Sequence, residues 1–296
     1  MKIITMDQML SFLRDNNYLI DVIGLKNGEI DGFSSAKNYR NNSLTWIKNQ
    51  ENADLYNGEI SVCIIPQNVN FDAKTIIVCN NPKAAFFSAV EHFWGTKENE
   101  GGVGQGTIIG NNVTIGKNVS IGNNCSITGN VSIGAQTIIG DNVVIRNNVK
   151  IGERCVVQSL TVIGEDGFAY SEDANHFKTM IKHYGGVIIG DDVFIGSHVN
   201  IARGTIDNTV IESGVKIAPS SHIGHNNYIE HNSTVICSQL YGSGHMGKNS
   251  YIVASVLRNQ CSIGNNSMIG MGSVVTKDIE EHKLAFGTPA KVIKDI

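Results

Sequence analysis

The sequence lacks the features that mark membrane-spanning, exported or nucleic-acid-binding proteins. No apolar run among its 296 residues approaches the roughly 18 residues that a membrane span needs. Lysine and arginine form no basic stripe and the formal net charge is −4, so a nucleic-acid partner is not expected. Residues 1–15 lack the basic and then apolar pattern of a secretory signal. We therefore expect a cytoplasmic protein without a membrane span.

Cysteine is sparse, and its spacing does not favour a metal site. None of the six cysteines belongs to a Cys-x-x-Cys pair. Several fall on positions that the repeat described next predicts to be buried, so we expect them to act as small hydrophobic residues. The six are Cys63, Cys79, Cys125, Cys155, Cys237 and Cys261. No bound metal and no permanent cofactor are predicted.

What the sequence has in abundance is a repeat of six residues. Isoleucine or valine returns at every sixth position from Ile109 to Ile163 without a miss, and glycine follows it in most turns. Six residues suffice for one short strand and one corner, and three such units would close a triangular coil of about 18 residues. Glycine and asparagine suit the corners. The pattern predicts a mainly β fold, a parallel β-helix of hexapeptide repeats over residues 101–280, followed by a tail at 281–296.

The repeat is interrupted, and the interruptions are informative. It resumes in three blocks, at residues 189–201, 211–235 and 263–275. The longest break, residues 165–186, is rich in aromatic residues and histidine, and a long excursion from a solenoid commonly lies on a binding face. Shorter breaks are predicted at residues 204–210 and 239–251.

Residues 1–100 lack the period and predict a small α/β domain. Helical spacing and short apolar runs predict two helices and two strands, at residues 6–16, 61–65, 74–79 and from Asn81-Pro82 onward. Asp7 is the predicted N-cap of the first helix. Residues 98–106 are polar and glycine-rich, which predicts a hinge into the coil.

Ordered motifs in both parts of the chain resemble a known family. The motifs are residues 43–49 (SLTWIKN), 162–170 (VIGEDGFAY), 202–209 (ARGTIDNT) and 222–226 (HIGHN). They are similar to those of hexapeptide acyltransferases with a left-handed β-helix, in particular the UDP-3-O-acylglucosamine N-acyltransferases of lipid A synthesis. The resemblance implies a left-handed coil, a nucleotide-binding first domain (residues 1–100), and a homotrimer with active sites between subunits.

The chain also departs from that family, and the departures shape the expected function. The sequence up to Ile296 contains no helical extension after the coil, and its last residues resemble those of coenzyme A-dependent hexapeptide sugar acetyltransferases. Asn52 stands where the family has a tyrosine that helps to sandwich uracil, and Ala218 replaces an acidic residue before the catalytic histidine. We therefore expect N-acyl transfer from acyl-CoA, as co-substrate, to the amine of a dTDP- or UDP-linked amino sugar.

Two alternatives stay open. The first is the lipid A N-acyltransferase itself, which takes its acyl group from acyl carrier protein. The second and more distant is a metal enzyme like γ-carbonic anhydrase on the same coil, which would need about three histidines converging on zinc. The chain has enough histidines for such a site in its coil, at His198, His222, His225, His231 and His245.

For N-acylation, an amine must lose a proton as it attacks a thioester, and histidine titrates in the right range. The resemblance makes His225 the base and places the adjacent Asn226 among the substrate-binding residues. His231 lies one repeat further on and is expected to be a solvated neighbour. Gly242 and Gly244 are candidates for donating backbone N–H groups to the acyl oxygen on the acyl-CoA side of the site.

The remaining candidates bind the two substrates. Trp46 offers a face for stacking on a base, and Asn49 offers a donor and an acceptor for a pyrimidine edge. Phe168 and Tyr170 are predicted to wall the sugar pocket, and Arg203 to contact a phosphate or, with Asp207, to anchor the break in the coil. Three lysines are candidates for the phosphates of coenzyme A, at Lys277, Lys291 and Lys294.

Overall fold

The computed structural model describes residues 2–56, 58–95 and 101–296. The chain forms two compact units, Met1–Glu98 and Asn99–Ile296. The predicted boundary at residue 100 and the start of the predicted hinge lie outside the described residues. The rest of the hinge prediction is partly wrong, because β8 (Gly102–Val103) already pairs in parallel with β11 (Ser120–Ile121) of the coil.

The first unit is a small α/β fold, as predicted. Its five-stranded sheet has the order β2-β7-β6-β5-β4, in which β2 is antiparallel to β7 and the other strands are parallel. One face of the sheet shares a core with the helices α1 and α3, and the other face buries a second apolar cluster. The elements are β1 (Ile4–Thr5), α1 (Met6–Asp15), β2 (Leu19–Gly24), β3 (Glu29–Ile30), β4 (Gly32–Phe33), η1 (Ala36–Asn38), β5 (Ser43–Trp46), α2 (Gln50–Ala53), β6 (Val62–Ile65), β7 (Thr75–Cys79) and α3 (Pro82–Trp94).

The first helix starts at Met6 as predicted, but its predicted N-cap is wrong by two residues. Thr5, not Asp7, is the N-cap of α1: its hydroxyl accepts a hydrogen bond from the N–H of Gln8, and the Gln8 side chain accepts one from the N–H of Thr5. This reciprocal capping box satisfies two N–H groups that the helix leaves free. Asp7 lies inside the first turn, where its negative charge interacts favourably with the positive end of the helix dipole.

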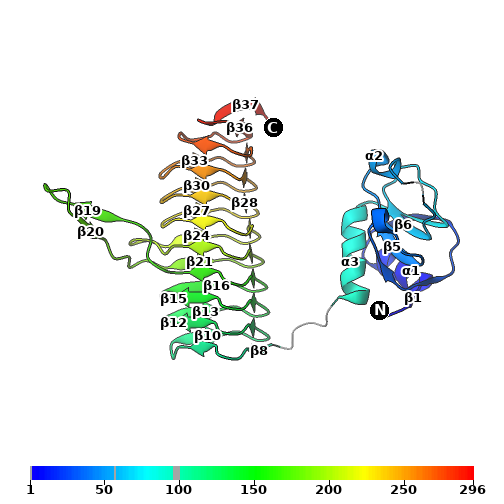
Figure 1. Ribbon diagram of the computed structural model, residues 1–296, viewed down its shortest axis with the longest axis horizontal. Coiled ribbons are helices and arrows are strands. Elements are labelled where there is room, and N and C mark those ends of the chain that lie inside the picture. The colour runs from blue at the N-terminus through cyan, green and yellow to red at the C-terminus, as the bar shows by residue number, and fades with distance from the viewer. Residues whose placement is uncertain (1, 57, 96–100) are drawn as a thin grey trace. The chain divides into compact units, whose positions relative to one another are not determined.

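The second unit is the predicted coil, a parallel β-solenoid with three faces (Figure 1). Its sheets contain 8, 11 and 9 strands. The first sheet has β10 (Val113–Ile115), β13 (Val131–Ile133), β16 (Val149–Ile151), β21 (Val187–Ile189), β24 (Thr209–Ile211), β27 (Tyr228–Ile229), β30 (His245–Met246) and β33 (Ser262–Ile263). The second has β8, β11, β14 (Ile138–Ile139), β17 (Val156–Val157), β22 (Phe194–Ile195), β25 (Lys216–Ile217), β28 (Thr234–Ile236), β31 (Tyr251–Val253), β34 (Met268–Ile269), β36 (Lys283–Phe286) and β37 (Lys291–Asp295). The third has β9 (Ile108–Ile109), β12 (Ser126–Thr128), β15 (Val144–Arg146), β18 (Val162–Ile163), β23 (Asn200–Ile201), β26 (His222–Ile223), β29 (Gln239–Leu240), β32 (Val256–Leu257) and β35 (Val274–Val275).

The six-residue period is explained by the register of these strands. Ile127 pairs with Ile145 and Ile145 with Ile163, so each partner lies three repeat units further along the chain, and all three side chains are fully buried. Each turn thus stacks its aliphatic residues on those of the turn before. Many corners hold a residue with positive φ, most often asparagine, which tolerates this conformation better than other residues with a β-carbon.

Neighbouring residues of one strand test how much the inward column contributes to stability. Ile139 is 2% exposed and Ile138 is 39% exposed. We expect Ile139→Ala to lower the free energy of unfolding by about 2–5 kcal/mol, because it leaves a cavity between stacked turns. Ile138→Ala, the matched control, should change it by less than about 0.5 kcal/mol. The midpoints of urea denaturation measure the difference. Equal midpoints for the two variants would contradict the packing of Ile139 in the column of inward aliphatic side chains.

The predicted break at residues 239–251 is wrong, because the coil continues through it. Leu240, Met246, Ile252 and Leu257 are all fully buried and occupy inward positions. Ile223 pairs with Leu240, which lies one position short of three full units, so one unit of this turn is shortened to five residues. The two short units, from Val235 to Leu240 and from Ile252 to Leu257, shift the repeat out of register and conceal it in the sequence.

The long excursion leaves the coil after β18 and returns at β21. Ile151 pairs directly with Ile189, so the whole excursion is inserted into a single turn of the coil. It forms an antiparallel hairpin of β19 (Tyr170–Glu172) and β20 (Lys178–Met180) that projects from the side of the coil (Figure 1). The predicted break at residues 204–210 is also present, because Ile189 pairs with Ile211, which lies beyond the position that three regular units would reach.

Candidate active site at the base of the excursion

His225 lies in the corner that follows β26 and lines a pocket of 670 Å³. The pocket is enclosed by residues of several successive turns of the coil and by the base of the excursion. Its lining includes Phe168, Met180, His222, Tyr241 and Gly242. The excursion and the coil therefore meet at the histidine that the sequence analysis predicted as the base.

The side chain of Asn226 determines which nitrogen of His225 carries a proton. Asn226 Oδ1 accepts hydrogen bonds from the backbone N–H and the hydroxyl of Thr205, at 3.0 and 2.8 Å, which identifies it as the oxygen of the amide. The same oxygen lies 3.0 Å from Nδ1 of His225. Because a carbonyl oxygen only accepts, His225 must donate from Nδ1, so in the neutral ring the lone pair lies on Nε2. This is the tautomer that a general base needs.

The short break in the coil holds Asn226 in this orientation. Thr205 belongs to the segment that lengthens the turn between Ile189 and Ile211, and Asn226 Nδ2 donates to the backbone oxygen of Asp207 at 3.2 Å. Asn226 was predicted to bind substrate, and the structure places it behind His225. The predicted anchoring role of Asp207 stays a prediction, since it is only the main chain of Asp207 that contacts Asn226.

Two glycines bracket the imidazole of His225. Gly242 lies one turn beyond His225, since Ile223 pairs with Leu240, and a Cβ built on it would lie 2.5 Å from Nε2 of His225. A Cβ built on Gly167, in the excursion, would lie 3.0 Å from Cβ and Cδ2 of His225. A side chain at position 242 would therefore displace the ring, and one at position 167 would press tightly against it. Within residues 2–56, 58–95 and 101–296 the N–H of Gly242 has no hydrogen-bond partner.

His222 is the second histidine of the pocket. Its burial, and then the positive charge that His225 can carry, lower the pKa of His222. Both causes favour the neutral imidazole of His222. His222 therefore adds a polar but uncharged wall beside His225.

Comparison with known proteins agrees with the predicted repeat. A family model described as bacterial transferase hexapeptide (six repeats) matches residues 130–165, and one described as hexapeptide repeat of succinyl-transferase matches residues 186–218 and 246–277. Hexapeptide repeats are thus matched in three segments of the coil. The predicted left-handed parallel β-helix is confirmed by this match and by the similarity to solved structures given next.

The similar proteins are named as acyltransferases. The chain is 35% identical over 128 residues to a UDP-3-O-acylglucosamine N-acyltransferase of Janthinobacterium sp. (43% of this chain, 36% of that protein). It is 48% identical over 82 residues to UDP-3-O-acylglucosamine N-acyltransferase 2 of Legionella pneumophila (27% of this chain, 23% of that protein). The crystal structure of UDP-N-acetylglucosamine O-acyltransferase from Moraxella catarrhalis is similar with a TM-score of 0.59 and 26% identity, over 64% of this chain and 72% of that one. The matches thus span about a third or less of the length of these two curated relatives.

The other predicted substrate-binding residues of the second unit lie in the excursion or beside it. Phe168 lines the pocket of His225 and is 76% exposed. Tyr170 begins β19, and its ring centroid lies 5.8 Å from that of Phe168. Arg203 is buried: its Nε donates to the backbone oxygen of Gly185 at 2.8 Å, and its guanidinium lies 4.0 Å from the Asp166 carboxylate. Arg203 thus ties together the two ends of the excursion.

Removing the guanidinium of Arg203 should loosen the excursion without unfolding the coil. A buried hydrogen bond to a charged group contributes about 1.5–3 kcal/mol, so Arg203→Met is expected to raise the rate of proteolytic cleavage within residues 165–186 roughly tenfold or more. Limited proteolysis with mass spectrometry measures it. Lys182→Met is the matched control, because Lys182 is an exposed cation of the same excursion. Identical cleavage of both variants would show that Arg203 does not anchor the excursion.

The candidates for acyl-donor binding are spread over the later turns. Gly244 lies two residues after Gly242, and a Cβ built on it would lie 2.6 Å from Oδ1 of Asn227. Lys277, Lys291 and Lys294 are exposed on the last turns of the unit and do not line the pocket of His225. Their contacts with coenzyme A stay predictions.

The nucleotide-binding candidates belong to the first unit. Trp46, on β5, lines a pocket of 410 Å³ together with Phe33, Phe86 and Phe87, and its ring centroid lies 6.3 Å from that of Phe87. Asn49 is the N-cap of α2, where its side-chain oxygen accepts from the N–H of Asn52 at 3.0 Å. Trp46 thus has an aromatic pocket beside it, while one lone pair of the Asn49 side-chain oxygen is engaged in the cap.

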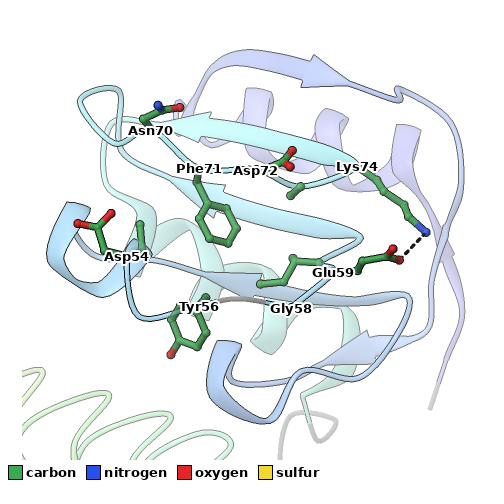
Figure 2. A pocket seen from close by; sticks show the side chains of 11 residues that line it. Asp54, Tyr56, Gly58, Glu59, Asn70, Phe71, Asp72 and Lys74 are labelled. Atoms are coloured by element: carbon green, nitrogen blue, oxygen red, sulfur yellow. Dashed lines mark ion pairs between the residues drawn. The ribbon is translucent and has the colours of Figure 1, made fainter.

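A second cavity of the first unit, of 760 Å³, holds none of the predicted residues (Figure 2). Figure 2 shows Tyr56 and Phe71 at its walls and the ion pair of Lys74 with Glu59. Nζ of Lys74 lies 3.8 Å from Oε2 of Glu59. This exposed ion pair contributes little to stability or binding. The cavity therefore offers no charged group that is held firmly enough to suggest a function.

Among residues 2–56, 58–95 and 101–296, no three His, Cys, Asp or Glu side chains converge in a way that could bind a metal ion. The three helices α1, α2 and α3 of this part of the chain are too short or too polar to cross a bilayer.

Proposed function

We propose that this protein is an N-acyltransferase that moves an acyl group from a thioester to the amine of a UDP-linked amino sugar. The observation that carries the proposal is the geometry of His225, whose Nδ1 is committed to Asn226 and whose Nε2 keeps its lone pair beside a pocket of 670 Å³. The names of the similar proteins support the acceptor class. They favour the alternative of the sequence analysis, UDP-3-O-acylglucosamine as acceptor, over dTDP-linked sugars.

The chemistry follows from the tautomer. Nε2 of His225 accepts a proton from the amine as the amine nitrogen attacks the carbonyl carbon of the thioester. The carbonyl oxygen of the tetrahedral adduct becomes negative, and the free N–H of Gly242, one turn away, stabilises it. When the carbon–sulfur bond breaks, the imidazolium of His225 returns its proton to the thiolate. The products are an amide and a thiol, and His225 ends neutral.

The acyl donor has two candidates. Acyl carrier protein is implied by the resemblance to the lipid A enzymes. Acyl-CoA is implied by the resemblance of residues 286–296 to CoA-dependent acetyltransferases, with Lys277, Lys291 and Lys294 as phosphate partners. Both donors present a thioester on the same phosphopantetheine arm, so the reaction at His225 is the same for each.

A homotrimer with sites between subunits is part of the proposal. Phe168 and Met180, which line the pocket of His225, are 76% and 57% exposed. A second copy of the coil would cover these apolar side chains and close the pocket. Light scattering of the purified protein tests the assembly.

A donor and acceptor panel tests the function. The purified protein is mixed with UDP-3-O-acylglucosamine and with UDP- and dTDP-linked amino sugars, each with acyl carrier protein or CoA thioesters of several chain lengths. Free thiol release and product mass are measured, with His225→Ala as the blank. Acceptor-dependent thiol release with a matching amide mass supports the proposal and identifies the donor. No amide with any combination would refute it.

A further inference from the structure

The excursion buries only one side chain between Glu165 and Tyr184, and it is a histidine. His183 is 0% exposed, whereas its neighbours Lys182 and Tyr184 are exposed. Burying an imidazole has a cost unless its nitrogens are satisfied. A hairpin exposed nearly throughout therefore places one titratable group against the coil.

The hydrogen bonds of His183 show which ring nitrogen carries a hydrogen in the neutral form. Nδ1 lies 3.0 Å from the backbone oxygen of Ile181, which only accepts, so His183 donates from Nδ1. Its backbone N–H donates to the Asp166 carboxylate at 3.2 Å. Nε2 is buried and has no hydrogen-bond partner among the described residues. In the neutral ring this nitrogen carries a lone pair that no protein donor satisfies in that part of the chain.

The imidazole of His183 lies beside that of His225. The two ring centroids are 5.3 Å apart and the rings are inclined by 77°. Nε2 of His183 and Cδ2 of His225 lie 3.1 and 3.0 Å from the same point, the position that a Cβ on Gly167 would occupy. Cδ2 is bonded to Nε2 of His225, the nitrogen that gains the proton. A β-carbon at position 167 would lie tightly against both rings.

We propose that His183 is a positioning residue for His225: its buried lone pair faces the edge of the ring that becomes positive when His225 accepts the proton of the amine. The partial negative charge of the lone pair stabilises the imidazolium, and it acts strongly because the contact is buried. This inference rests on the proposed function. The other titratable groups around the pair are Asp166, Arg203 and His222, none of which forms a hydrogen bond with Nε2 of His183.

The test compares His183→Leu with His183→Gln. Leucine fills the site without a lone pair, whereas the glutamine amide can donate to the Ile181 oxygen and offer its own oxygen to His225. We expect kcat of His183→Leu to fall roughly tenfold to 10²-fold with KM unchanged. The acidic limb of its pH profile should move to lower pH, because the imidazolium of His225 loses a stabilising partner. His183→Gln should recover most of both losses.

A matched control and a readout without turnover complete the test. His176→Leu removes an exposed histidine of the same hairpin and should leave kcat and its pH profile unchanged. Carbon-13 NMR titration of the His225 ring, assigned with His225→Ala, should show a lower pKa of His225 in His183→Leu than in the wild type. Nitrogen-15 shifts of the wild type should show His183 neutral with Nε2 unprotonated.

Each result decides for or against the inference. An unchanged titration of His225 in His183→Leu, or a wild-type His183 protonated at Nε2, would overturn it. If His183→Leu does not fold, the His183→Gln titration and the wild-type nitrogen shifts decide alone. If no acceptor in the panel is acylated, the proposed function fails, while a shifted His225 titration still supports the coupling of the two rings.

Discussion

His225→Ala is expected to lower the rate of acyl transfer by about 10²- to 10⁴-fold, because the variant has no group to accept the proton of the attacking amine. KM should change little, since His225 is one of many residues that line the pocket. The fold should survive: His225 is half-buried in a corner and contributes nothing to the inward column of Ile223 and Ile229. Single-turnover rates and circular dichroism of the same preparation measure both properties.

His231→Ala is the matched control, because His231 stands one six-residue unit after His225. Its Nδ1 lies 3.1 Å from a Glu212 carboxylate, and it does not line the pocket. We expect wild-type turnover from this variant. If His225→Ala kept near-normal turnover, the leaving thiolate or another residue would have to accept the proton, and the assignment of the base would be wrong.

The coil could be predicted from the sequence because its rule is local. Most inward positions hold an isoleucine or valine six residues from the next. The stacking of turns follows from this spacing alone, without information about residues far apart in the chain. Leu240, Met246 and Leu257 escaped this rule for two reasons. They are not β-branched, and two shortened units shift them out of register. The corners of these short units contain Cys237 and Ala254 with positive φ, which no residue preference signals.

The site was predicted only where a motif marks it. The segment of residues 222–226 points to His225 through resemblance, but the role of Asn226 as its partner depends on Thr205, in an earlier turn of the coil. His183 could not have been connected with His225 from the sequence. The two lie far apart in the chain, and their contact depends on where an exposed hairpin returns to the coil. The signal that was available in the sequence is the presence of histidine in the excursion.

Gly242→Ala should reduce turnover by about 10²-fold, because a misplaced catalytic base costs nearly as much as a missing one. The added Cβ would lie 2.5 Å from Nε2 and 2.6 Å from Cε1 of His225, distances that real Cβ contacts do not reach, so the imidazole must turn away. Alanine keeps the backbone N–H that we propose for the oxyanion. The φ of Gly242 is not in the left-handed region, so the chain itself can accept alanine. The loss should therefore come from the displaced base, with stability close to that of the wild type.

A double-mutant cycle separates this mechanism from a direct effect on the oxyanion. In the His225→Ala background the new methyl group meets no ring, so adding Gly242→Ala should cause almost no further loss of residual rate. The measurement is kcat for the wild type, both single variants and the double variant. If Gly242→Ala lowered the rate by the same factor with and without His225, the two residues would act independently. The backbone at Gly242 would then matter for the acyl oxygen and not for the position of the base.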